Sequence, residues 1–166
     1  MKKILLSFLT LLGISVGGKA QTMEKLDIGL RKTIELTSKK FERNNHAFLI
    51  NVAKDNVVVI QLIHGILIPM SLGKSMNEIK NSDRIFNFSL NLPFNNHEKN
   101  ELEKFKNLDV FEKFKYYDAN GIPCYSINFG TNQQEAKLVT LEILQKVYNY
   151  KLNDTFEFEI YDQGRF

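Results

Sequence analysis

The sequence has one cysteine, Cys124, three prolines and no tryptophan among its 166 residues. A single cysteine excludes a disulfide within the chain, so a hydrophobic core must hold the fold together. The motifs of phosphate-binding loops, zinc proteases, serine hydrolases, paired-cysteine metal sites and calcium loops are absent. The three histidines, His46, His64 and His97, stand on separate segments without metal-ligand spacing. The sequence therefore predicts no catalytic residue, no metal site and no cofactor.

The sequence also contains no apolar run of about 20 residues, which is the length that a membrane span needs. A shorter run, over residues 4–16, follows two lysines at the N-terminus, and small residues continue it to Ala20. This order is typical of a secretory signal peptide of bacterial form, with cleavage before Gln21. We therefore expect residues 1–20 to be a signal peptide and the protein to be periplasmic or secreted. Attachment to a membrane is expected only if this segment stays uncleaved.

Removing the signal changes the charge of the chain. The formal net charge is +3, but residues 1–20 hold three of the 22 basic residues and none of the 19 acidic ones. The mature chain is therefore neutral, which argues against binding to nucleic acid through bulk positive charge. Its composition, 43% hydrophobic and 25% charged, is typical of a folded protein. Without a repeat or linker, residues 21–166 are expected to form one domain.

Hydrophobic periodicity predicts helices that alternate with strands. The predicted helices cover residues 23–43, a short segment around Leu102, and residues 131–150, with Thr131 as the first residue of a capping box. The predicted strands cover 47–52, 57–63, 85–92, 113–118, 122–129 and 155–161. Residues 64–84 are expected to be irregular, with a short strand near Ile66 and a helical turn near Met76. This order predicts an α+β fold in which two or three helices pack on one face of a largely antiparallel sheet of five or six strands.

Asn120-Gly121 is the strongest turn signal in the chain. A two-residue turn there pairs Ala119 with Ile122 and Tyr117 with Cys124. The apolar side chains of both strands then share one face, so the turn and the side-chain pattern predict the same register.

The opposite face of the sheet is the candidate functional surface. Strands 85–92 and 155–161 alternate apolar and polar residues, which is typical of strands with one wet face. The expected outward residues are Asn87, Ser89, Lys115, Tyr117, Cys124, Ser126, Asn128, Glu157, Glu159 and Tyr161. A broad polar face with tyrosines suits contact with a protein or peptide, so we expect an exported, non-enzymatic binding domain. Its oligomeric state is not predicted.

Two other functions remain open at this stage. A small hydrolase-like enzyme could use Glu157 and Glu159 as acid and base, or Cys124 as nucleophile, if a pocket and a histidine lay beside them. A carrier of apolar small ligands would need a cavity under the sheet. The expected lining of that cavity is Phe86, Phe88, Phe156 and Phe158.

The order of elements over residues 23–150 is similar to that of type III secretion chaperones, which are small α+β proteins. The resemblance lies in the order of helices and strands, without a shared motif. It implies an architecture and no site residue. Those chaperones act in the cytoplasm, whereas the N-terminal segment of this chain predicts export.

Overall fold

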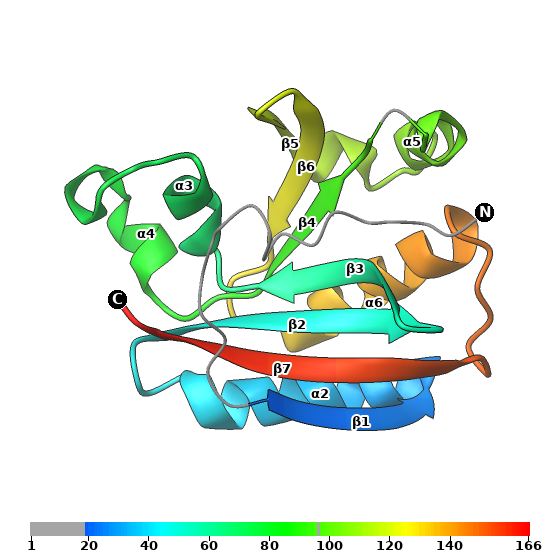
Figure 1. Cartoon of the computed structure of the whole chain (residues 1–166), viewed down its shortest axis with the longest axis horizontal. Coiled ribbons are helices and arrows are strands. Elements are labelled where there is room, and N and C mark those ends of the chain that lie inside the picture. The colour runs from blue at the N-terminus through cyan, green and yellow to red at the C-terminus, as the bar shows by residue number, and fades with distance from the viewer. Residues whose placement is uncertain (1–18, 96) are drawn as a thin grey trace.

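The computed structural model describes residues 19–95 and 97–166, which form one seven-stranded sheet with helices (Figure 1). The expected signal peptide lies outside the described residues except for its last two positions. The strands are β1 (Lys19–Lys25), β2 (His46–Lys54), β3 (Val57–Ile63), β4 (Ser89–Pro93), β5 (Lys115–Ala119), β6 (Ile122–Asn128) and β7 (Thr155–Arg165). Their order in the sheet is β1-β7-β2-β3-β4-β6-β5, and all neighbouring strands are antiparallel. The predicted α+β class is confirmed, with one strand more than the upper expectation.

Three longer helices pack on one face of this sheet: α2 (Leu26–Phe41), α5 (Lys99–Lys106) and α6 (Gln133–Lys146). Their apolar side chains join those of the strands in the main core. A 3-10 turn, η2 (Phe111–Lys113), precedes β5. The prediction that helices cover one face is confirmed for these three helices.

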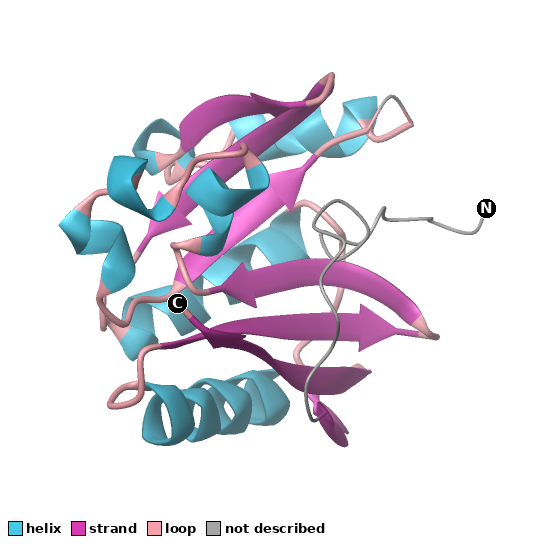
Figure 2. Cartoon of the chain, turned by 60° about the vertical axis from the view of Figure 1, so that its left-hand side comes forward, coloured by secondary structure: helices cyan, strands magenta, loops and turns pink. Residues whose placement is uncertain are grey.

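A second, smaller helical segment covers part of the other face. It consists of α3 (Leu67–Ser71), η1 (Met76–Glu78) and α4 (Asn81–Arg84), and we call residues 64–84 the cover segment. The cover segment and α6 lie on opposite sides of the strands (Figure 2). A second core fixes it there, formed by Ala47, Leu49, Ile63, Ile66, Leu67, Ile79 and Tyr161. The predicted helical turn near Met76 is confirmed, whereas the strand expected near Ile66 is wrong because this residue is the N-cap of α3.

Several predicted boundaries are wrong where pairing between distant segments decides the structure. Residues Met23 to Lys25 were expected to start the first helix, but they belong to β1 and pair with β7. The strand predicted for 155–161 extends to Arg165 because it pairs with β2 across an irregularity between His46 and Phe48. It therefore lies between β1 and β2, inside the sheet.

Of the phenylalanines expected to line a ligand cavity, Phe88, Phe156 and Phe158 are buried in the main core and Phe86 packs against it. The Phe86 and Phe88 ring centroids are 5.1 Å apart, and the Phe156 ring lies 5.0 Å from that of Tyr150. Phe158 packs directly against Gly29 of α2. Close packing of these rings argues against an apolar carrier.

The hairpin is confirmed in position and register. Ala119 pairs with Ile122 and Tyr117 with Cys124. Asn120 and Gly121 both have positive φ angles, of 56° and 84°. A two-residue turn of this type requires that conformation, which asparagine and glycine adopt readily.

Candidate functional site

A row of polar residues crosses the sheet from edge to edge. Residues directly opposite each other on paired strands point to the same face. From β1 to β5 the register aligns Gln21, Glu159, Asn51, Gln61, Asn91, Ser126 and Lys115, which we call the polar row. It lies on the face opposite the main core, so the predicted polar face exists.

The middle of the polar row is a buried hydrogen-bond network. The Gln61 Nε2 donates to the Asn51 Oδ1 at 2.7 Å, and the Asn51 Nδ2 donates to Glu159 at 3.3 Å. The Tyr161 hydroxyl donates to the same Glu159 oxygen at 2.7 Å. Buried polar groups are stable when they are satisfied in this way, so this part of the row has a structural role.

Much of the predicted binding surface is therefore not open to solvent. Five of its ten residues are buried, with exposed fractions of 9% or less: Asn87, Ser89, Cys124, Glu159 and Tyr161. The cover segment explains part of this burial. The Gly65 amide donates to the Asn87 Oδ1 at 2.9 Å, and the Ser89 hydroxyl donates to the same oxygen at 3.1 Å. The expectation of an open face is wrong for these five residues. Residues 64–84 pack over the end of the sheet that carries Asn87 and Tyr161.

The other five residues keep some or all of their exposure: Lys115 and Asn128 are exposed, and Tyr117, Ser126 and Glu157 are half-buried. Tyr117 donates its hydroxyl proton to the Asn91 Oδ1 at 2.7 Å. Glu157 accepts a long hydrogen bond from Gln21 Nε2, at 3.4 Å. The accessible part of the surface is thus concentrated on β5 and β6.

A cleft of about 400 Å³ lies between the cover segment and strands β4, β6 and β5. Four residues of the predicted surface line it: Ser89, Lys115, Ser126 and Asn128. The other lining residues are Gly65, Ile68, Pro69, Lys74, Lys80, Ser82, Asp83, Lys113 and Ile127. This volume is within the range of pockets that bind small molecules or side chains of a partner.

The charge of this cleft is predominantly positive. Four lysines line it, Lys74, Lys80, Lys113 and Lys115, against one carboxylate, Asp83. Among the residues that the structure describes, only Lys113 of these four forms an ion pair, with Glu135 at 3.4 Å.

One further carboxylate stands near the rim of the cleft. Hydrogen bonds from Ser75 lower the pKa of Glu78, and the charge of Lys74 lowers it further. Because these hydrogen bonds come from the cover segment itself, Glu78 stabilises η1 while Lys74 still lines the cleft.

Cys124 does not have the environment of a nucleophile. Its side chain is 1% exposed, and burial raises the pKa of its thiol to about 11. Its hydrogen-bond partner is Tyr117, whose pKa is also raised by burial. A reactive cysteine needs a lowered pKa and an accessible sulfur, so this geometry argues against catalysis by Cys124.

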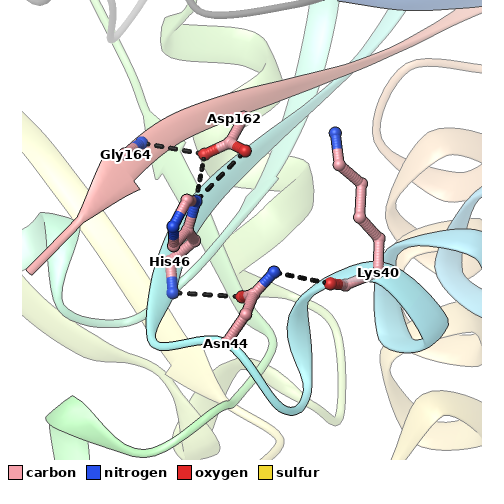
Figure 3. Close-up of polar contacts among 5 residues, drawn as sticks. All are labelled: Lys40, Asn44, His46, Asp162 and Gly164. Atoms are coloured by element: carbon pink, nitrogen blue, oxygen red, sulfur yellow. Dashed lines mark hydrogen bonds and ion pairs between the residues drawn. The ribbon is translucent and has the colours of Figure 1, made fainter.

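His46 forms a pair with Asp162 that joins β2 to the end of β7 (Figure 3). The His46 Nδ1 lies 2.9 Å from the Asp162 Oδ1, which also accepts a hydrogen bond from the Gly164 amide at 2.9 Å. Partial burial raises the pKa of Asp162, but the hydrogen bonds from Gly164 and His46 outweigh it and the pKa is lowered. Sequence reasoning missed this pair, because its members lie 116 positions apart in the chain.

The described contacts of His46 include no hydroxyl or thiol that it could activate as a base. The Asn44 Oδ1 accepts from the His46 amide, and the Asn44 Nδ2 donates to the Lys40 carbonyl (Figure 3). These bonds close the turn between α2 and β2. The pair therefore fastens this turn to the C-terminal end of β7.

The other two histidines lie in different surroundings. His64 is buried beside the rings of Phe48, Phe86 and Phe166, and its Nδ1 accepts a hydrogen bond from the Ile66 amide at 3.2 Å. His97 is exposed. Residues 19–95 and 97–166 contain no cluster of three or more histidine, cysteine or acidic side chains arranged for a metal ion.

No family model matches this chain, and no curated protein or solved structure resembles it significantly. The resemblance to type III secretion chaperones therefore stays a prediction from the order of elements. Over the part of the chain that the structure describes, no helix is long and apolar enough to cross a membrane.

Proposed function

We propose that this protein is an exported, non-enzymatic domain that binds a protein or peptide at the cleft between the cover segment and β5–β6. The observation behind the proposal is the cleft itself. It is lined by exposed Lys115 and Asn128 and half-buried Ser126, whereas much of the same sheet face is buried. A concave site with convergent polar groups is the usual form of a binding site.

The state of the candidate nucleophile supports binding over catalysis. Cys124 is buried with a raised pKa, and Glu159 is buried in the polar row, where it accepts hydrogen bonds from Asn51 and Tyr161. Neither residue lines the cleft.

A variant that fills the cleft tests this proposal. The change Ser126→Phe places a ring at the floor of the cleft, and Asn153→Phe adds similar bulk at an exposed loop that does not line it. Peptides selected from a random displayed library on the wild-type protein should bind Asn153→Phe equally and Ser126→Phe at least about tenfold more weakly. Unchanged thermal melting of both variants provides the folding control. Failure to select any peptide, or equal binding to Ser126→Phe, contradicts the proposal.

Export is tested by fractionating cells that express the full chain. The proposal expects the protein outside the cytoplasm, with a mass that corresponds to a chain beginning at Gln21. An intact chain that remains in the cytosol contradicts it.

A further inference from the structure

We infer that the cleft binds an acidic peptide segment, with carboxylates of the peptide held among the four lysines. This inference rests on the proposed function and specifies the chemistry of the partner. A ligand that brings several negative charges would balance the lysine excess, whereas a cationic or purely apolar ligand would not. Because the mature chain is neutral overall, this attraction is a local property of the cleft.

The lysines stand on two opposing walls. Lys74 and Lys80 belong to the cover segment, whereas Lys113 ends η2 and Lys115 begins β5. Lysines thus line both sides of a space of about 400 Å³. A single small anion can approach the lysines of only one wall. An extended chain with separated carboxylates can pair with the lysines of both walls.

The floor of the cleft offers hydrogen bonds between the charges. Ser126 and Asn128 contribute a hydroxyl and an amide group from β6. Hydroxyls and amides can donate to carboxylates and to peptide carbonyls. All four cations in the lining are lysines, whose ammonium groups act as point charges and need no bidentate geometry to pair with a carboxylate. Lysines on both walls, with neutral donors between them, favour an extended acidic chain over a single phosphate group.

The test compares a labelled peptide of alternating glutamate and serine with its glutamine counterpart, binding each to the purified protein. Charge reversal on both walls, in the double variant Lys74→Glu/Lys115→Glu, should weaken binding of the glutamate peptide at least about tenfold. The double variant Lys99→Glu/Lys151→Glu makes the same charge change at exposed lysines outside the cleft, and it should bind as the wild type does. Binding by the wild type should also weaken as salt is raised.

Three results overturn the inference. They are equal binding of the glutamate and glutamine peptides, an equal effect of the two double variants, or stronger binding of inorganic phosphate or an oligouronate than of the glutamate peptide. Melting curves of both variants separate loss of binding from loss of folding. If peptides from the random library bind at the cleft but are not acidic, the proposed function stands and only this inference fails.

Discussion

Gly29 shows how one residue sets the distance between a helix and the sheet. A Cβ atom built at this position would lie 2.1 Å from the Cε2 of Phe158, a fully packed ring of β7. The absence of a side chain therefore allows α2 to approach β7 closely. Neither the ring nor the strand can move without disturbing the main core.

We expect Gly29→Ala to lower the free energy of unfolding by about 1–3 kcal/mol, because overpacking outweighs the better helix propensity of alanine. Leu36→Ala provides the control on the same helix, since Leu36 is 53% exposed, and its effect should stay within about 0.5 kcal/mol. Urea unfolding measures both. A Gly29→Ala variant as stable as the wild type would show that α2 can shift away from Phe158.

His64 makes the stability of the fold sensitive to acid. Burial lowers its pKa from 6.5 to about 4, so the folded protein favours the neutral ring. The unfolded chain takes up a proton below about pH 6.5, whereas the folded chain does so only near pH 4. The stability that depends on a neutral His64 is therefore fully present above pH 6.5 and is lost as the pH falls towards 4.

We expect the free energy of unfolding of the wild type to fall by about 3 kcal/mol more than that of His64→Asn between pH 7 and pH 4. Asparagine keeps an acceptor for the Ile66 amide but does not titrate. Comparing the two proteins cancels the contribution of shared carboxylates. Parallel pH profiles would contradict the assignment.

At the scale of elements, α6 begins one residue later than the capping box predicted. The sequence places Thr131 at the cap, but the Asn132 Oδ1 accepts the hydrogen bond from the Glu135 amide, at 3.1 Å. The residues Thr131 and Asn132 both have cap-forming side chains, so the local pattern alone does not decide between them.

Replacement of each residue by alanine distinguishes the two caps. We expect Asn132→Ala to destabilise the protein by about 1 kcal/mol, the usual cost of a lost N-cap, and Thr131→Ala to have little effect. Chemical denaturation measures both variants. A larger loss from Thr131→Ala would restore the original assignment of the cap.

The elements that the sequence predicted well are those determined by neighbouring residues. Asn120-Gly121 specified the hairpin and its register, and alternation correctly placed Phe156 and Phe158 in the main core. Residues Met23 to Lys25 were wrongly predicted as helix because their partner strand, β7, lies more than 130 residues further along the chain. The hydrophobic periodicity of a segment gives no information about which distant strand the segment pairs with.

The candidate site was predictable only where neighbouring residues determine the structure. Alternation placed Ser126 and Asn128 on the correct face, and both line the cleft. Lys74 and Lys80 were missed because residues 64–84 have no regular period. Their position depends on a contact between distant residues, the hydrogen bond from Gly65 to Asn87.

At the scale of the whole molecule, the two faces of the sheet carry cores of unequal size. The main core joins α2, α5 and α6 to the strands, whereas the second core contains seven buried residues under the cover segment. A small core with few apolar contacts opens at lower free energy than the rest of a protein. The wall of the cleft that holds Lys74 and Lys80 therefore belongs to the less stable part of the structure.

We expect Ile66→Ala, in the second core, to accelerate amide hydrogen exchange in residues 66–84 while leaving exchange in α2 nearly unchanged. Leu30→Ala, in the main core, should instead accelerate exchange throughout the sheet. Exchange followed by mass spectrometry resolves the two patterns. Uniform acceleration in Ile66→Ala would show that both cores unfold together.

The position of β1 has a consequence for the proposed cleavage before Gln21. The bond between Ala20 and Gln21 lies within this strand, where Ala20 pairs with Ile160 and Gln21 with Glu159. A peptidase must take its substrate as a free extended chain, so a folded molecule would protect this bond. If the chain is cleaved before Gln21, as proposed, cleavage would have to come before β1 pairs with β7, and the new N-terminus would exist before the C-terminal strand completes the sheet.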